Sequence, residues 1–354
     1  MQRLAFHVEV GVPMAHSLHC DGRNIVGAFL ALVGPEGSSG LNTNNFFYNT
    51  ASKKVDNEKK KKHRAGFVNI VGNPNVGKST LSNLLVGERL SIITSKAQTT
   101  RHRIMGIVNG DDYQIVFSDT PGVLKPKFKL QESMLDFSTG ALVDADVLLY
   151  VTDVVESPTK NKDFLDRVAR EKVPVLLVIN KIDLLKGQSD LEAKIDEWKQ
   201  LLPQAEVWPT SALAKFNVDN LKRRIIELLP ENPPYFGKDA LTDRSSRFFV
   251  TEIVREKILL EYDKEVPYST QVIVEKFDET DTSIHIMAVI YVERDSQKGI
   301  IIGRGGAKLK RLGTDARKEI EKFFEKHVYL QLFVKVEKDW RNQESKLRQF
   351  GYIE

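Results

Sequence analysis

Apolar and polar positions in the middle of the chain follow two alternating patterns. Short runs of apolar, often β-branched residues are typical of buried strands, whereas apolar residues spaced three or four positions apart are typical of helices. The runs predict strands over residues 67–71, 104–108, 113–118, 147–153, 173–179 and 206–208. The spaced positions predict helices over residues 79–86, 131–143, 160–170, 191–201 and 218–229. This alternation indicates an α/β fold with a mostly parallel sheet covered on both faces. Asn109-Gly110 between the second and third strands predicts one hairpin.

A proline-rich segment separates this pattern from a second one. Residues 230–237 read PENPPYFG, which cannot continue a helix and is typical of a domain boundary. Beyond it the pattern predicts the order α-β-β-α-α-β, an α+β domain. Its elements are expected over residues 246–262, 270–277 and 283–292, around Lys298, in a long helix to His327, and over 329–337. We therefore divide the chain into an extension (1–65), a first domain (66–230), a linker (231–242) and a second domain (243–354).

The extension carries little structural signal. Residues 1–50 lack a sustained period, and residues 34–45 are rich in Gly, Ser and Asn, so we expect no fixed fold there. Whether the reading frame begins this early, and what the extension does, stay open. The run Lys59–Arg64, KKKKHR, fits either a contact with phosphate or anionic lipid or a solvated tether, and we favour the tether.

The first predicted strand leads into a glycine-rich turn and a helix. Gly72 to Ser79 fits G-x-x-x-x-G-K-[ST], a loop whose backbone N–H groups surround phosphate at a helix N-terminus. Lys78 would bind the β and γ phosphates and Ser79 a Mg²⁺ ion. The predicted nucleotide contacts of this loop are Gly72, Asn73, Pro74, Asn75, Val76, Gly77, Lys78, Ser79 and Thr80.

Two further loops are expected around the γ-phosphate. Asp119 follows the third strand and can reach Mg²⁺ through a water, while Gly122 can offer its N–H to the γ-phosphate. In the segment KAQTTR a threonine can complete the Mg²⁺ shell, and we prefer Thr100 over Thr99. The predicted catalytic residues are Lys78, Thr100 and Gly122, the Mg²⁺ ligands are Ser79, Thr100 and Asp119, and the other contacts of this loop are Thr120 and Pro121.

The base of the nucleotide is predicted from the ends of two later strands. Asn180, Lys181 and Asp183 form N-K-x-D, and a carboxylate at Asp183 can accept hydrogen bonds from N1–H and the 2-amino group of guanine. Adenine offers neither donor, so a buried carboxylate would be left unpaired against it. Ser211 and Ala212 follow the next strand, and we expect the Ala212 N–H near guanine O6. Four motifs in order, each after a strand, predict a GTPase.

A second glycine turn points to nucleic acid. Gly303, Arg304, Gly305 and Gly306 match the G-x-x-G loop that clamps single-stranded nucleotides in KH domains, and Lys308 follows directly. Residues 297–326 hold nine Lys or Arg against four Asp or Glu, a local net charge of +5. We expect Arg304 and Lys308 to contact phosphate. Four aromatic residues could stack on bases, although the spacing of the first three is more often that of core residues: Phe323, Phe324, Phe333 and Trp340.

Composition narrows the protein class. The net charge of the 354 residues is only +4, so nucleic-acid affinity has to come from local clusters. A single cysteine, Cys20, excludes an internal disulfide framework and favours a reducing compartment. No apolar run reaches the roughly 18 residues of a membrane span.

These motifs resemble those of the translation-factor-related GTPases, and KAQTTR, DTPG and the second domain together resemble the Era family of ribosome-assembly GTPases. The resemblance covers about Gly66 to Ile353. It implies a Ras-like GTPase domain followed by a type II KH domain, with GTP or GDP and Mg²⁺ as ligands. It also implies binding of small-subunit ribosomal RNA near its 3′ end and help in small-subunit assembly. We expect a cytoplasmic monomer, with a peripheral contact at the inner face of the cell membrane left open.

Two positions bear on the rate of hydrolysis. Val123 follows DTPG where Ras-like enzymes carry a water-orienting glutamine, so slow intrinsic turnover is expected. Asn75 lies where related GTPases use an asparagine to help hold K⁺ beside the phosphates, and an ordinary loop-closing role is the alternative.

A rival function is a membrane-associated signalling GTPase whose second domain binds protein or lipid. An RNA-modifying enzyme has no cysteine nucleophile or metal cluster to support it.

Overall fold

The computed structural model describes residues 62–353 apart from Thr159, and these belong to one compact unit, residues 59–354. The extension over residues 1–65, with Cys20 and half of Lys59–Arg64, therefore lies almost entirely outside the described residues. Within the described part, none of the helices combines the length and apolar character that crossing a membrane requires.

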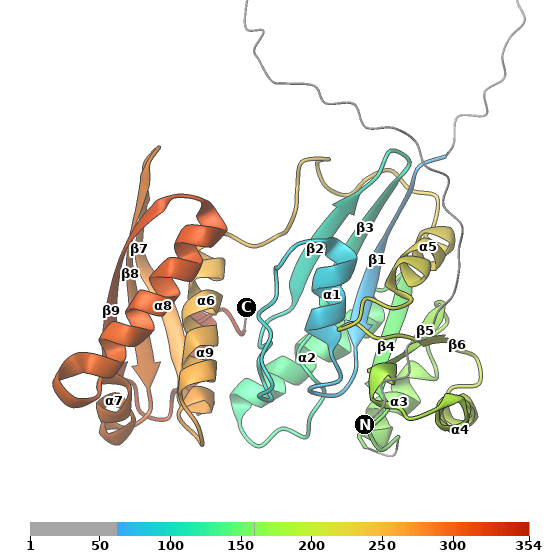
Figure 1. Ribbon diagram of the computed structural model, residues 1–354, viewed down its shortest axis with the longest axis horizontal. Helices are drawn as coiled ribbons and strands as arrows, with labels where there is room; N and C mark the ends of the chain where they lie inside the picture. Colours follow the sequence, from blue (N-terminus) through green and yellow to red (C-terminus); the bar gives the residue numbers. More distant parts are fainter. Residues whose placement is uncertain (1–61, 159, 354) are drawn as a thin grey trace, which may run out of the picture. The chain divides into compact units, whose positions relative to one another are not determined.

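The first half of the described chain builds a six-stranded sheet in the order β2-β3-β1-β4-β5-β6 (Figure 1). Its strands are β1 (Arg64–Val71), β2 (Ile104–Asn109), β3 (Tyr113–Asp119), β4 (Val147–Asp153), β5 (Val175–Asn180) and β6 (Glu206–Pro209). Only β2 and β3 pair antiparallel, as the Asn109-Gly110 turn predicts. The central strands β4 and β5, VLLYVTD and VLLVIN, are buried along their whole length because helices cover both faces.

Two apolar clusters, each built largely from residues on one face of the sheet, hold the helices in place. The helices are α1 (Lys78–Val86), α2 (Lys129–Val143), α3 (Lys162–Val168), α4 (Gln188–Leu201) and α5 (Val218–Leu228). One cluster contains Leu81 of α1 and Leu221 of α5. The other contains Leu142 of α2, Phe164 of α3 and Trp198 of α4. The carboxyl ends of the parallel strands are thereby held rigidly next to the loops that carry the sequence motifs.

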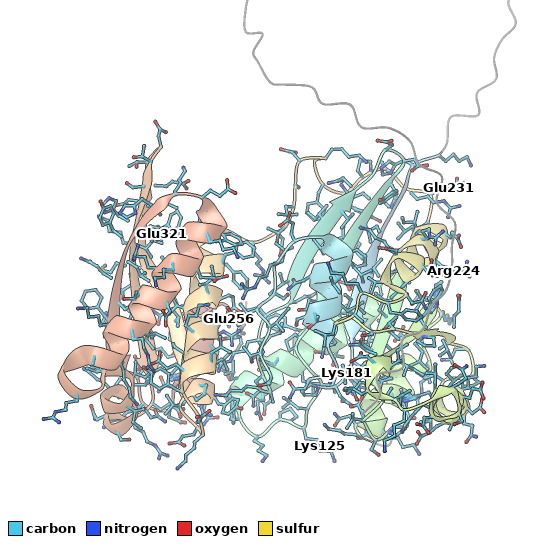
Figure 2. The ribbon with its side chains drawn as sticks, viewed as in Figure 1. Lys125, Lys181, Arg224, Glu231, Glu256 and Glu321 are labelled. Carbon is cyan, nitrogen blue, oxygen red and sulfur yellow. The ribbon has the colours of Figure 1, made fainter. Side chains whose placement is uncertain are left out.

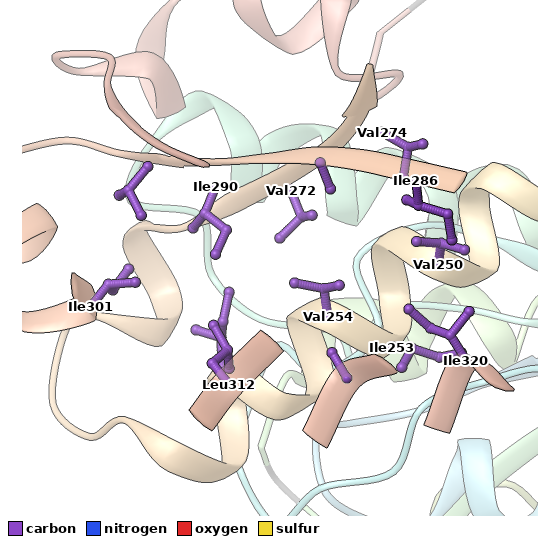
Figure 3. Close-up of a cluster of buried hydrophobic side chains, with 14 of the residues drawn as sticks. Val250, Ile253, Val254, Val272, Val274, Ile286, Ile290, Ile301, Leu312 and Ile320 are labelled. Carbon is purple, nitrogen blue, oxygen red and sulfur yellow. The ribbon is translucent and has the colours of Figure 1, made fainter. Parts of the chain in front are cut away.

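The second half packs helices against a three-stranded sheet in the order β7-β8-β9. Its elements are α6 (Ser246–Glu261), β7 (Gln271–Glu279), β8 (Ser283–Val292), α7 (Asp295–Ile302), α8 (Ala307–Phe324), β9 (His327–Val336) and α9 (Glu344–Gln349). β7 and β8 pair antiparallel, and β8 and β9 parallel. Figure 3 shows α6 residues such as Val254 facing Val272 and Ile290 of the sheet, with Leu312 of α8 in the same core.

The fold class is confirmed, with corrections at individual elements. The long helix predicted to reach His327 ends at Phe324, because Glu325 adopts a left-handed conformation with φ 53°. The last strand consequently starts at His327. The pattern gave no signal for α9, which packs in a cluster with Trp340. The expectation that Trp340 stacks on bases is wrong, since its side chain is fully buried and its indole N–H donates to the Ser269 carbonyl at 3.0 Å.

Residues of the predicted linker lie against the first sheet. The Ile107 N–H of β2 donates to the Leu241 carbonyl at 2.8 Å, and the Gln114 amide accepts from the N–H groups of Tyr235 and Phe236. An apolar cluster also joins Leu130 and Met134 of α2 to Trp340 and other residues near the C-terminus. The predicted domain boundaries stay predictions, because these contacts join both halves into one unit.

Candidate functional site

The phosphate loop is built from close backbone approaches that only glycine permits. Gly72 has φ 145° and Gly77 has φ 95°, conformations that side chains disfavour. A Cβ atom at Gly72 would overlap the Val151 carbonyl oxygen, and one at Gly77 would overlap the Asn180 amide nitrogen. Gly122 approaches the loop from the other side, because a Cβ there would lie 2.7 Å from the Pro74 backbone nitrogen. These glycines therefore fix the shape of the cradle.

Lys78 is the buried cation of this loop. Its side chain is 6% exposed, and its Nζ donates to the Asn73 carbonyl at 2.8 Å. Burial lowers the pKa of Lys78 to about 8, against the smaller opposing effects of the Asp119 and Glu156 carboxylates. A phosphate group beside this ammonium would stabilise the charged form and raise the pKa again, so the site is suited to an anion.

The threonine segment brings one hydroxyl to the phosphate loop. Thr100 Oγ1 lies 2.8 Å from Ser79 Oγ, whereas Thr99 Oγ1 donates to the Lys96 carbonyl at 2.6 Å. The geometry therefore favours the choice of Thr100 over Thr99 as partner of Ser79 in the Mg²⁺ shell.

Asp119 completes the set of oxygen donors. Both of its carboxylate oxygens are buried without a hydrogen-bond partner among the described residues. Burial raises the pKa of Asp119, and nearby hydroxyls of Ser91 and Ser79 and the Lys78 ammonium lower it by less. The neighbouring hydroxyls do not reach hydrogen-bond geometry, and a buried carboxylate without such bonds is expensive unless a cation compensates it. Together with the Ser79 and Thr100 hydroxyls it offers the hard oxygen ligands that Mg²⁺ prefers, so the residues fit this ion.

The segment after Asp119 is tied to the first strand and the phosphate loop. Thr120 Oγ1 donates to the Ile70 carbonyl at 2.7 Å, and the Val123 N–H donates to the Gly72 carbonyl at 3.1 Å. Pro121 accepts from Ser138 Oγ at 2.8 Å. These bonds place the Gly122 backbone beside the cradle, as its predicted role requires.

The residues predicted to read guanine form one connected group. Asn180 Nδ2 donates to the Val76 carbonyl at 2.8 Å, and Asn180 Oδ1 accepts from the Ala212 N–H at 2.9 Å. The Ser211 hydroxyl donates to the Asp183 carboxylate. A contact between the Ala212 N–H and guanine O6 therefore requires this donor to be shared between Asn180 and the base.

Lys181, labelled in Figure 2, links this group to the phosphate loop. Its Nζ donates to the Asn75 carbonyl and to Asp153 Oδ2, both at 2.6 Å. Asn75 itself has φ 66°, and its Nδ2 donates to the Ser95 carbonyl at 3.2 Å. Its side-chain amide therefore faces the segment that leads to the two threonines.

A cavity of about 310 Å³ lies between the phosphate loop and the segment that carries the two threonines, and its lining does not include Asn180, Asp183 or Ala212. Most predicted phosphate-loop residues line it, together with Thr100, Thr120, Gly122 and Lys181. Gln98 of KAQTTR also lines the cavity. Sequence reasoning missed part of the wall, which comes from the segment between α1 and KAQTTR: Ile92, Ile93, Thr94 and Ser95. This segment has no motif, and only its place between two phosphate-binding segments could have suggested it.

The second glycine turn reaches the surface and adopts backbone conformations that glycine tolerates without strain. Gly303, Gly305 and Gly306 have φ of 70°, 59° and 79°. Arg304 and Lys308 are exposed beside them, and the Lys308 ammonium lies 5.7 Å from the centre of the Tyr262 ring. The turn thus presents backbone and cations together to solvent.

A groove of about 390 Å³ continues from this turn. It is lined by Gly306, Leu309, Lys310, Gly313, Thr314, Arg317, Leu330 and Leu332. Within the described residues, three exposed cations of the turn and the groove form no ion pair: Arg304, Lys308 and Lys310. Arg317 and Lys326, by contrast, pair with Glu321 and Glu279. An apolar floor with unpaired cations at its rim suits single-stranded RNA. Of the other aromatics, Phe323 is 41% and Phe333 46% exposed, whereas Phe324 packs against the core.

Comparison with known proteins agrees with both sites. Residues 67–181 match a family model described as 50S ribosome-binding GTPase, and residues 265–341 match a KH domain model. The chain is similar to Era solved in complex with MgGDPNP and nucleotides 1506–1542 of 16S ribosomal RNA, with 40% identity, a TM-score of 0.79, and 82% of this chain and 100% of that chain covered. Identity, coverage and TM-score are the same for a variant of Aquifex aeolicus Era bound to GDP·AlF4⁻.

Replacement of Asp183 by Asn should move base preference from guanosine to xanthosine nucleotides. The amide oxygen would accept from N1–H of either base, and the amide NH2 would donate to the O2 of xanthine but face another donor at the 2-amino group of guanine. Affinities for GDP and XDP measured on one preparation check this. A variant that keeps its preference for GDP would show that Asp183 does not read the base.

Proposed function

Because the chain belongs to the Era family of GTPases, we propose that it is a GTP-switched factor that binds small-subunit ribosomal RNA near its 3′ end and assists assembly of the small ribosomal subunit. The observation that carries the proposal is the 40% identity, across both sheets, to Era bound to MgGDPNP and a 16S RNA fragment. The GTPase family model names the 50S subunit in its description, but it matches only residues 67–181. The Era structure matches 82% of this chain and was solved with RNA of the small subunit.

The chain is a GTPase, and its own residues suggest how GTP is held. Lys78 and the N–H groups of the phosphate loop would bind phosphate, and Ser79, Thr100 and Asp119 would hold Mg²⁺, which neutralises charge on the phosphates when bound. Slow intrinsic turnover is part of the proposal. Val123 is 3% exposed within an apolar cluster, so it neither faces the phosphate nor offers a group that orients water.

A potassium ion next to Asn75 is a further part of the proposal. The Asn75 Nδ2 bond to the Ser95 carbonyl brings an amide and a backbone carbonyl together at the edge of the nucleotide cavity. Oxygen atoms of both groups are ligands of the kind alkali cations accept. The charge of such an ion would replace that of an arginine finger.

We also propose that the protein is cytoplasmic and monomeric. The rival membrane-bound function is weakened by the described end of the basic run. Lys62 pairs with Glu231 at 2.7 Å, the Arg64 guanidinium donates to the Leu229 carbonyl at 3.0 Å, and the His63 ring bonds the Asn232 carbonyl. These bonds within the chain compete with lipid headgroups for the three side chains. A peripheral membrane contact stays untested.

Substitution of both Gly305 and Gly306 by Asp should reduce affinity for an RNA oligonucleotide with the small-subunit 3′-end sequence by more than about tenfold, since two carboxylates would face the phosphates. Fluorescence anisotropy measures this. The control adds the same charge at Gly140 and Gly187, where a Cβ meets nothing within 4 Å. Both variants should bind GDPNP as the unmodified chain does. Retained RNA affinity in the first variant would refute the clamp.

Replacement of K⁺ by Na⁺ should slow GTP hydrolysis by about tenfold, because the larger ion matches a site made of an amide and carbonyl oxygens. An Asn75→Ala variant should hydrolyse GTP at one slow rate in both salts. Single-turnover phosphate release at equal ionic strength provides the measurement. Equal rates for the unmodified protein in the two salts would eliminate the potassium site.

A further inference from the structure

The segment that carries the two threonines is bonded to the second half of the chain on both sides. We call residues 94–103 the threonine loop. Lys96 Nζ donates to the Tyr262 carbonyl and, at 2.8 Å, to Asp263 Oδ1. Arg101 donates through Nη1 to the Thr270 carbonyl at 2.7 Å and through Nη2 to the Pro267 carbonyl at 3.1 Å. The two threonines therefore lie between two anchored cations.

A third bond acts at the threonines themselves. Arg255 of α6 donates through Nη2 to the Thr99 carbonyl. Its Nε and Nη2 also bind the Glu252 carboxylate, at 2.9 and 2.6 Å. The Arg255 side chain is fully buried and that of Glu252 is 3% exposed. The guanidinium thus has a fixed orientation toward the loop.

The burial of this ion pair is better explained by its contact with the threonine loop than by a contribution to the stability of the fold. Removal of two charges from water costs about as much as their attraction returns, so apolar residues would serve packing equally well. The planar guanidinium holds a carboxylate through two parallel bonds and a carbonyl through a third, all in fixed directions. An apolar side chain cannot do this, and an ammonium on its flexible stem would not fix the directions of the bonds. Arg255 therefore does something specific for the Thr99 carbonyl.

We propose that Arg255, supplied by the RNA-binding domain, is a positioning residue for GTP hydrolysis. The Thr99 carbonyl and the Thr100 nitrogen share one planar peptide group. A hydrogen bond that fixes the carbonyl therefore also fixes the position of the Thr100 nitrogen and Cα. Thr100 then meets Ser79, with 2.8 Å between the hydroxyl oxygens. The proposal rests on the role of Thr100 as a Mg²⁺ ligand.

The neighbouring residue of α6 contacts the chain just before the threonine loop. Glu256, labelled in Figure 2, accepts from Arg89 Nη2 at 2.6 and 2.7 Å and from the Ile93 N–H at 3.4 Å. It contacts the chain six to seven residues before the threonines and has no bond to them. Glu256 therefore docks α6 against the first half of the chain, whereas Arg255 makes the bond to the Thr99 carbonyl.

Replacement of Arg255 by Lys should raise the Mg²⁺ concentration for half-maximal GDPNP binding by about tenfold and lower kcat similarly, since an ammonium on a flexible stem does not fix the directions of both bonds as the planar guanidinium does. KM at saturating Mg²⁺, affinity for GDP and the thermal midpoint should change little. Trypsin should cut faster at Lys96 and Arg101 in the GDPNP-bound variant. If the lysine variant does not fold, the pair Glu252→Gln and Arg255→Met removes both buried charges.

Arg244→Lys is the matched control, because Arg244 donates to the Arg103 carbonyl, three residues beyond Thr100. It should leave the Mg²⁺ requirement unchanged. Thr100→Ala should raise that requirement at least as much as Arg255→Lys. An impaired Thr100→Ala variant beside an unimpaired Arg255→Lys variant would overturn the positioning role alone. An unimpaired Thr100→Ala variant would overturn the metal assignment and the positioning role together.

Discussion

The structure depends most on the double attachment of the threonine loop. Thr100 Oγ1 lies 2.8 Å from Ser79 of the phosphate loop, while the adjoining Thr99 carbonyl accepts a hydrogen bond from Arg255 of α6. A segment that has to close on Mg²⁺ and phosphate is thus also part of the contact between the two halves. In a GTPase such a segment changes its order when the γ-phosphate leaves. Here that change cannot occur without loss of bonds to the helix that supports the RNA-binding core.

Burial of charge prepares the nucleotide site for its ligands. Lys78 and Asp119 are both withdrawn from water, and burial shifts the pKa of each toward the neutral form. Phosphate and Mg²⁺ would compensate these two groups simultaneously, so each ligand favours the other. Tyr262, at the C-terminal end of α6, connects the threonine loop to the second glycine turn. Its carbonyl accepts from Lys96, and its hydroxyl donates to the Ile301 carbonyl at 2.9 Å, two residues before Gly303.

Much of the fold and the nucleotide site could be predicted from the sequence because local rules govern them. Apolar runs locate the strands, and Gly72 and Gly77 reflect steric limits that any sequence must obey. Trp340 was misjudged because an aromatic residue outside a periodic element gives no sign of its burial. Arg255 could not be found at all, because its function comes from a carbonyl 156 residues away that carries no sequence signal. Long-range contacts of backbone groups are invisible to motif reasoning.

The central claim is that the threonine loop links the nucleotide to the RNA clamp. Linkage between two binding sites is reciprocal, so it must appear in affinity for RNA. The direct measurement is titration of the full chain with single-stranded RNA of the small-subunit 3′ end, in the presence of Mg²⁺ with GDPNP or with GDP. Binding at least about fivefold tighter with GDPNP is predicted, corresponding to about 1 kcal/mol of coupling. Equal affinities in the two nucleotide states would contradict the account.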